Sequence, residues 1–391
     1  MGPHNLGISG MVQNIVAQAS LLLGVIYSTV LVREYKNAST DEMRNQLVRV
    51  TNTFRLMGAL VFCLIGGILM AFHLIPPDYH FAGWFFVPLL LITTAQPVWV
   101  FQAAEKQHFQ SVISVLQPAL TAGLYILFFR PGISAGADLG VISIVSGILT
   151  VIYWWAIYRL TPMKGKLFDL QGFQSAWNLV LQSRWLFVSS LAIYIFTTLE
   201  QPLLGWLYSI EELGKYRTAI TVTNAAAGIF SIVSTILYPR FIEWEKLGPE
   251  LFWKRQIKLA VFFSTTGSLI CFCGFILIPF FYPFVFGPGF SQAAVPCAIL
   301  VTAKFVATLN GIFYWGLITQ SHYDKSSTLV LIGVAILSLF CNLIFIPKWG
   351  MYSTAIVNLS SEILLLFIWI LISRKRIKTI RRISANLNLL G

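Results

Sequence analysis

Eleven long apolar segments divide this sequence, and each is close to the roughly 20 residues that an α-helix needs to cross a lipid bilayer. They are too long for the strands of a membrane barrel and lack the alternating pattern of such strands. Because only helices and closed barrels satisfy every backbone group within lipid, we expect an all-α polytopic membrane protein. The segments are Ile8–Val32, Leu56–Ile75, Ala82–Ala104, Ser111–Phe129, Leu139–Tyr158, Trp185–Leu207, Ala219–Leu237, Leu259–Phe281, Ala293–Ile318, Leu329–Ile346 and Met351–Ile372.

The basic residues predict the orientation of these segments. Of the 27 Lys and Arg residues, 22 lie on alternate connections and the C-terminal tail, and four lie on the opposite side. The positive-inside rule places the first group, with the tail, in the cytoplasm and the N-terminus of this chain outside. The net charge of +12 is therefore a topology signal and favours anionic lipid head groups, not nucleic acid. An outside N-terminus with an odd number of helices suggests that one helix is missing from the front.

The chain also contains an internal repeat. Leu6-Gly7 precedes the first segment, which closes with Ser28–Leu31, and Leu213-Gly214 precedes the seventh, which closes with Ser234–Leu237. Two copies of like orientation predict two lobes related by an axis along the membrane normal, although apolar stretches can also resemble one another by chance. The expected divisions are an N-lobe of five helices at 1–160, a cytoplasmic linker at 161–184, a C-lobe of six helices at 185–373 and a basic cytoplasmic tail at 374–391.

Four stretches of the sequence, in order along nearly the whole chain, resemble the polysaccharide biosynthesis family, the Wzx-type O-antigen flippases of the multidrug/oligosaccharidyl-lipid/polysaccharide (MOP) exporter superfamily. The longest of them resembles the signature of the family's last helix. Against the family pattern, this chain begins at the turn that should follow the first helix. The four stretches are Gly2-Pro3 with Leu6-Gly7, Leu199–Gly205 with Glu212–Tyr216, Phe286–Phe290 with Ala293–Pro296, and Asn342–Ile356 with Ser361-Glu362.

The resemblance implies a flippase of the bacterial inner membrane. Such a protein moves undecaprenyl-pyrophosphate-linked oligosaccharide repeat units to the periplasmic leaflet by alternating access, for O-antigen, exopolysaccharide or capsule biosynthesis. It implies a lipid-linked oligosaccharide as substrate, H⁺ or Na⁺ as coupling ion, and a polymerase and glycosyltransferases as pathway partners. No cofactor is expected.

Lys304 is the main candidate for binding the substrate. It lies near the middle of an apolar segment, where a cation costs at least about 2.5 to 3.5 kcal/mol unless it meets water or a partner. A pyrophosphate in a hydrated cavity would compensate that cost. A structural ion pair with Glu200 or Glu362 is the alternative. These two carboxylates are themselves candidates for ion coupling, because access to either side of the membrane would alter their protonation.

Other polar residues suggest helix faces that line a cavity or form hydrogen bonds between helices. Asn14 and Gln18 are four residues apart and share one face, and Asn224 lies on another segment. Arg217 and Tyr216 are expected at the outer mouth, as substrate ligands or as interfacial anchors.

Two other functions are alternatives to the flippase. An ion-coupled exporter of small molecules, as in the MATE transporters of the same superfamily, would share the fold, but a cationic centre fits pyrophosphate better than a cationic drug. A membrane glycan polymerase or glycosyltransferase is disfavoured, since the connections lack paired carboxylates, a nucleophile with a base, or a phosphate-cradling glycine loop. The five cysteines lie inside apolar segments and the five histidines are scattered, so neither an enzyme nor a metal site is predicted.

Overall fold

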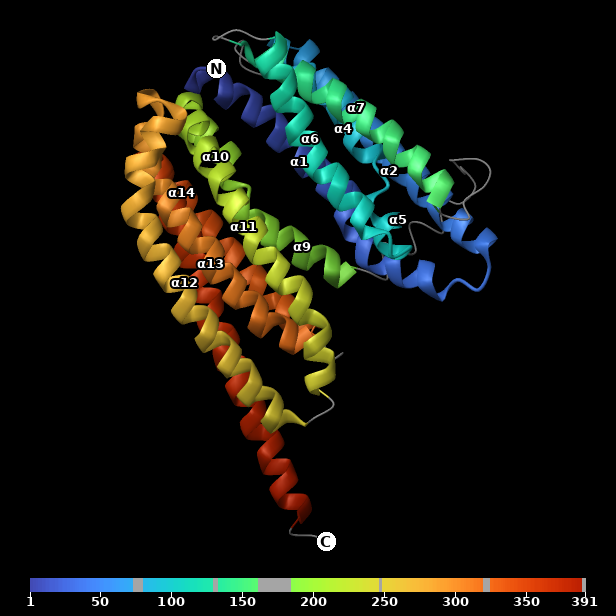
Figure 1. Cartoon of the computed structure of the whole chain (residues 1–391), viewed down its shortest axis with the longest axis vertical. Coiled ribbons are helices and arrows are strands. Elements are labelled where there is room, and N and C mark those ends of the chain that lie inside the picture. Colours follow the sequence, from blue (N-terminus) through green and yellow to red (C-terminus); the bar gives the residue numbers. More distant parts are fainter. Residues whose placement is uncertain (73–79, 129–132, 161–183, 246–247, 319–323, 389–391) are drawn as a thin grey trace. The chain divides into compact units, whose positions relative to one another are not determined.

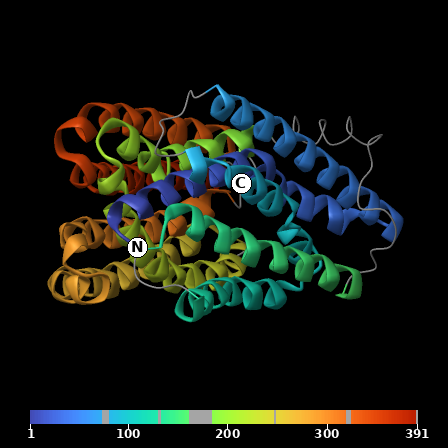
Figure 2. The same cartoon turned by 90° about the horizontal axis from the view of Figure 1, so that it is seen from above.

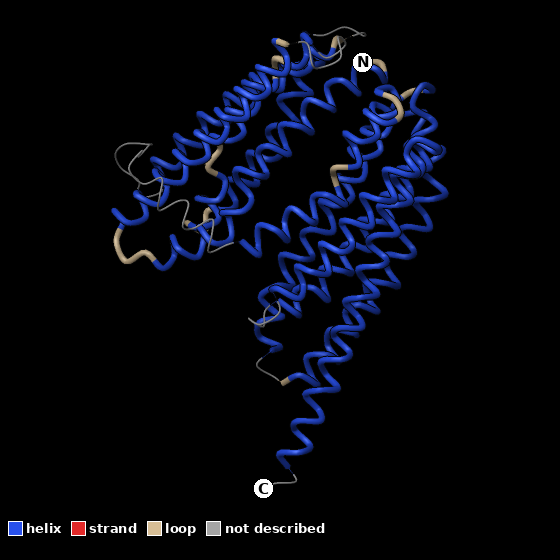
Figure 3. Tube along the Cα trace, turned by 180° about the vertical axis from the view of Figure 1, so that it is seen from behind, coloured by secondary structure: helices blue, strands red, loops and turns tan. Residues whose placement is uncertain are grey.

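The computed structural model describes residues 1–72, 80–128, 133–160, 184–245, 248–318 and 324–388. Throughout these ranges the chain forms helices and short connections, and no strand (Figure 3). The chain divides into two compact units, unit 1 at Met1–Leu191 and unit 2 at Ala192–Gly391, and each is described by itself. The predicted linker at 161–184 lies outside the described residues except for its last residue.

Each of the eleven expected segments is mainly helical over its described part, so the predicted all-α membrane fold is confirmed. Eight helical stretches among the described residues are long and apolar enough to cross a membrane. One of them, Lys325–Lys375, contains the last two expected segments. Large apolar side chains such as Phe272, Phe280 and Phe284 are exposed along one helix of unit 2, as expected for a surface that faces lipid.

Unit 1 contains two long helices, then a helix in three pieces, then two more long helices (Figure 1). Thr40 caps the second long helix, because its hydroxyl accepts a hydrogen bond from the backbone N–H of Met43. The helices are α1 (Pro3–Asn37), α2 (Asp41–Ala71), α3 (His80–Gly83), α4 (Phe86–Ala95), α5 (Val98–Ala103), α6 (Gln107–Phe128) and α7 (Ala135–Leu160), and α9 (Arg184–Thr197) leads into unit 2.

Pro97 explains why the third expected segment is broken. Gln96 has an extended backbone with ψ of 119°, as a residue before proline prefers, and Pro97 has no N–H to continue the helix. Beyond the break, Phe101 is fully buried and packs against Phe109 and Tyr153, with ring centroids 5.4 and 5.6 Å away. These contacts hold α5 between α6 and α7.

Unit 2 is organised around one buried helix, which packs against three long neighbours (Figures 1 and 2). This central helix is α13, and it contacts α14, α11 and α12. The elements that follow α9 are α10 (Glu200–Leu207), α11 (Ile210–Glu245), α12 (Pro249–Phe286), the 3₁₀ helix η2 (Pro288–Ala293), α13 (Ala294–Ile318) and α14 (Asp324–Asn388).

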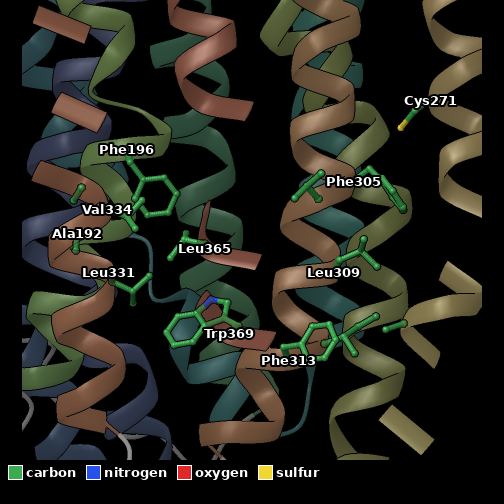
Figure 4. Packing of buried hydrophobic residues seen from close by; sticks show 14 of the residues in the cluster. Ala192, Phe196, Cys271, Phe305, Leu309, Phe313, Leu331, Val334, Leu365 and Trp369 are labelled. Carbon is green, nitrogen blue, oxygen red and sulfur yellow. The ribbon is translucent and has the colours of Figure 1, made fainter. Parts of the chain in front are cut away.

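Aromatic and aliphatic side chains from α9, α12, α13 and α14 form the core of unit 2 (Figure 4). Phe196, Leu365 and Trp369 lie together in it, and Phe305 extends toward α12. A Cβ on Gly267 of α12 would lie 1.8 Å from Cε2 of Phe305, so only glycine permits this close approach. The two helices are thereby packed tightly at the level of Lys304.

Gly350 divides α14 into two helical halves. Its φ of 53° and ψ of −134° are not helical, and three residues earlier Pro347 interrupts the hydrogen-bond ladder. The turn lets the chain reverse between the last two expected segments. A cavity of about 250 Å³ lies between the two halves, and Ser338, Ser353 and Ser361 are among its lining residues.

Candidate functional site

Glu200 is the centre of a buried hydrogen-bond network in unit 2. It is the first residue of α10, directly after a break in the helix at residues 198–199, and it is only 1% exposed. The hydroxyl of Tyr216 on α11 donates to Glu200 Oε1 over 2.7 Å, and Nδ2 of Asn358 on α14 donates to Oε2 over 3.1 Å. Both carboxylate oxygens are therefore satisfied by donors from two other helices.

Glu362 forms a second, similar hydrogen-bond arrangement, one turn after Asn358 on α14. Nδ2 of Asn310 on α13 donates to Glu362 Oε2 over 2.7 Å and to its backbone carbonyl over 2.9 Å. Glu362 is buried, and Asn310 is buried beside it. The asparagines of the two arrangements, Asn358 and Asn310, supply neutral donors to carboxylates that would otherwise be isolated within a membrane-spanning region.

Lys304 lies on α13, in the same helix as Asn310, and is half-buried. Within the described part of the chain, no ion pair within 4.0 Å joins Lys304 to a carboxylate, so the expected alternative of a structural ion pair is not seen. Its positive charge nevertheless attracts both Glu200 and Glu362, which repel one another when both are charged. We call these residues, with Tyr216, Asn310 and Asn358, the polar cluster of unit 2.

The other predicted residues are distributed over both units. Asn14 and Gln18 are half-buried on α1 in unit 1, and Nε2 of Gln18 is buried without a partner among the described residues. Asn224 is exposed on α11 and Arg217 is half-buried on the same helix. The structure thus brings Tyr216 to Glu200, where it is fully buried, and does not bring Asn224 into the same network.

The membrane-spanning part of unit 1 has a buried carboxylate of its own, Asp138 in the first turn of α7. Ser9 donates to its Oδ2 and Tyr125 donates to its Oδ1, while Nε2 of Gln13 donates to Ser9 Oγ over 3.0 Å. This group joins α1, α6 and α7. Sequence reasoning missed it, because Asp138 lies one residue before the apolar segment that begins at Leu139.

With this geometry, the chain can be compared with known proteins. The family model described as "Polysaccharide biosynthesis protein" matches residues 1–245, which is more than half of the chain. The chain belongs to the polysaccharide biosynthesis family. The resemblance found in the sequence motifs is therefore confirmed.

Two curated relatives of this family member carry transport names. A protein of Escherichia coli (strain K12) named as an O-antigen transporter is 20% identical over 373 residues, covering 93% of this chain and 87% of the relative. A protein of Haloferax volcanii named as a low-salt glycan biosynthesis flippase is 22% identical over 289 residues, covering 71% of this chain and 58% of the relative.

Solved structures with the same fold include two kinds of transporter. The lipid II flippase MurJ in an inward closed conformation has a TM-score of 0.65 and 12% identity, covering 95% of this chain and 86% of MurJ. An inward-facing multidrug resistance MATE transporter of the MOP superfamily has a TM-score of 0.64 and 12% identity, covering 97% of this chain and 92% of the transporter. These similarities show that the family member has a MOP-superfamily fold.

Proposed function

We propose that this family member is a flippase for undecaprenyl-pyrophosphate-linked oligosaccharides, which moves them from the cytoplasmic to the periplasmic leaflet by alternating access. The names of the curated relatives, an O-antigen transporter and a glycan biosynthesis flippase, support this cargo class. The fold shared with the lipid II flippase MurJ is consistent with it. Catalysis of a covalent reaction is not part of the proposal.

The observation that carries the proposal is Lys304. A half-buried cation in a membrane-spanning helix, without an ion pair in the described residues, needs water or an anionic ligand to offset its desolvation. The two phosphates of the cargo are such a ligand, and a lysine binds phosphate as a compact positive charge. Lys304 would therefore hold the pyrophosphate while the lipid tail stays in the bilayer. Asn14, Gln18, Asn224 and Arg217 are further proposed contacts along the path, whereas Tyr216 is buried against Glu200.

Glu200 and Glu362 are proposed to carry the coupling ion, H⁺ or Na⁺. Both are buried carboxylates held by neutral donors, so each can accept a proton or a metal cation without first breaking an ion pair. The attraction of Lys304 for both carboxylates gives a physical link between anionic cargo and ion. An anion that neutralises Lys304 weakens its hold on the carboxylates and favours cation uptake by them.

The proposed location is the bacterial inner membrane, with the C-terminus in the cytoplasm and the N-terminus of this chain in the periplasm. The concentration of basic residues on alternate connections supports this orientation. In that setting, glycosyltransferases would supply the lipid-linked repeat unit and a polymerase would consume it.

An ion-coupled exporter of small molecules is the second candidate, and the fold shared with MATE transporters favours it. The two functions differ in cargo charge, because a cationic drug would be repelled by Lys304. A membrane glycan polymerase has no comparable support.

The deciding experiment measures which leaflet holds the lipid-linked glycan in host cells with and without the gene. Accessible sugars are labelled on spheroplasts and on inverted membrane vesicles. Accumulation on the cytoplasmic face after deletion, relieved by re-expression, is the expected result. An unchanged distribution would contradict the flippase function and direct attention to small-molecule export.

A further inference from the structure

The break between α4 and α5 exposes backbone carbonyls inside a membrane-spanning stretch of unit 1. The structure satisfies them with side chains: Nε1 of Trp154 donates to the carbonyl of Ala95 over 3.0 Å, and Nη1 of Arg55 donates to the carbonyl of Gln96 over 3.2 Å. Broken helices at membrane depth occur where the backbone is buried in protein or lines a site for ions and polar ligands. The break is therefore a candidate ligand site.

Arg55 differs from the two other arginines on α2. Arg44 pairs with Asp41 over 2.9 Å and Arg49 pairs with Glu42 over 2.5 Å. Arg55 is only 8% exposed, and in the described part of the chain its guanidinium donates to a neutral carbonyl and pairs with no carboxylate. A buried charge without a counter-charge is strongly unfavourable, so an anion or ordered water must compensate it.

Several buried hydrogen-bond donors on α2 and α5 also have no partner among the described residues. They include Nε of Arg55, Nδ2 of Asn52 one turn earlier on the same face of α2, and Nε1 of Trp99 on α5, and the Nε atoms of Arg44 and Arg49 are unpaired as well. Asn52 is 4% exposed and Trp99 is 3% exposed. A ligand that satisfies these atoms must be an acceptor, since guanidinium and indole nitrogens can only donate.

We propose that the α4–α5 break of unit 1 is a binding site for a phosphate group, with Arg55 supplying the charge and Asn52 and Trp99 supplying further donors. The Arg55 guanidinium offers a fork of N–H donors that matches two phosphate oxygens. Phospholipids and phosphate-linked lipid carriers both present phosphate groups at the membrane surface, beside a membrane protein. The assignment to a lipid-linked cargo rests on the proposed function, but phosphate binding itself does not.

Thermal unfolding of the purified full-length chain in detergent tests the site, with inorganic pyrophosphate as probe and sodium chloride at equal ionic strength as reference. Every chain in this test carries Lys304→Ala, which removes the other proposed pyrophosphate ligand, and the chain with no further change serves as the wild type. Pyrophosphate should raise the melting temperature of this wild type. In Arg55→Gln its apparent affinity should fall at least about tenfold, as expected for losing a charged hydrogen bond. Arg49→Gln is the matched control, because Arg49 already has a carboxylate partner, and should respond as the wild type does.

Asn52→Leu is a second variant, which keeps the site testable if Arg55→Gln fails to fold. It leaves the Arg55 contact with Gln96 in place but removes an unpaired donor, so its melting temperature without pyrophosphate should be close to that of the wild type. Its affinity for pyrophosphate should still fall. No stabilisation of the wild type beyond the chloride reference, or equal stabilisation of both site variants, would overturn the proposal and leave water as the occupant of the break.

Competition then identifies the source of the phosphate. If phosphatidylglycerol in mixed micelles weakens the pyrophosphate effect and phosphatidylcholine does not, the site takes an anionic lipid head group. If neither competes, the site takes a phosphate that phospholipids cannot present, as expected for the cargo. Loss of the pyrophosphate effect in Arg55→Gln with an unchanged glycan distribution would establish the phosphate site independently of the flippase function.

Discussion

The hydroxyl of Tyr216 donates a hydrogen bond to Glu200 Oε1 over 2.7 Å, and both side chains are almost completely buried. The sequence places Tyr216 at an outer mouth, but the structure gives it the role of orienting a carboxylate. Asn358 holds the other carboxylate oxygen from α14. The carboxylate of Glu200 is therefore hydrogen-bonded to two helices besides its own, α11 and α14.

Replacing Tyr216 with Phe should lower transport and reduce stability by about 1 to 3 kcal/mol, because it leaves a buried carboxylate oxygen without its donor. Glycan export and thermal unfolding in detergent measure the two effects. Tyr352→Phe is the matched control, since Tyr352 is exposed and its hydroxyl donates to the carbonyl of Gln292 and not to a carboxylate among the described residues. Equal losses in both variants would show that Tyr216 has no special role at Glu200.

Lys304→Ala should abolish transfer of the glycan between leaflets while membrane insertion stays intact. Lys304→Arg keeps the charge and should retain part of the activity. Lys348→Ala removes an exposed lysine of the same unit and should transport as the wild type does. Labelling of accessible sugars on spheroplasts measures all three. Export by Lys304→Ala at the wild-type rate would exclude the pyrophosphate role.

What the sequence predicts depends on how far apart along the chain the interacting residues lie. Apolar length located the helices, and Glu200 and Glu362 were recognisable as carboxylates within them. Their partners were not recognisable, because Asn358 is 158 residues from Glu200 along the chain. Such pairs form when the helices pack together, and hydropathy does not predict which helices pack against one another.

Arg55 shows a second limit. Hydropathy begins the second segment at Leu56, which places Arg55 on a predicted cytoplasmic connection. The helix instead begins at Asp41, where Thr40 caps it and tertiary packing buries its polar first half. Arg55 is thereby carried into a membrane-spanning helix. A search for long apolar segments does not detect polar residues that extend an apolar helix.

Glu362→Gln should remove the dependence of transport on an ion gradient and retain a slow basal rate. The amide keeps an oxygen to accept the hydrogen bond from Asn310, but it can bind neither a proton nor Na⁺ with its former charge. Transport into inverted vesicles under imposed proton or Na⁺ gradients measures the effect. Glu212→Gln, which alters a pair with Lys215, is the control. An unaltered response to the gradient would exclude Glu362 from coupling.

The ion pair between Lys36 and Glu105, 2.7 Å long, should make a small acid-sensitive contribution to the stability of unit 1. The hydrogen bond and charge of Lys36 lower the pKa of Glu105 in the folded chain. The contribution is therefore present above the unfolded pKa and is lost as the pH falls through the lower folded value, below about pH 4. Glu105→Gln should remove this part of the pH dependence of thermal unfolding. Since the pair is exposed, added salt should weaken it, and a salt-independent effect would contradict this account.

Gly350→Ala should destabilise unit 2 by about 1 to 3 kcal/mol. The φ of 53° and ψ of −134° at this turn suit glycine, and an added Cβ would lie only 3.0 Å from Cε1 of Tyr208. Gly333→Ala, on the first half of the same helix, is a control for which the opposite change in stability is expected. It has open space around its Cβ position and should stabilise α14 by about 0.5 to 1 kcal/mol. Thermal unfolding of both variants measures the difference, and a neutral Gly350→Ala would mean that the reversal of α14 does not depend on this backbone conformation.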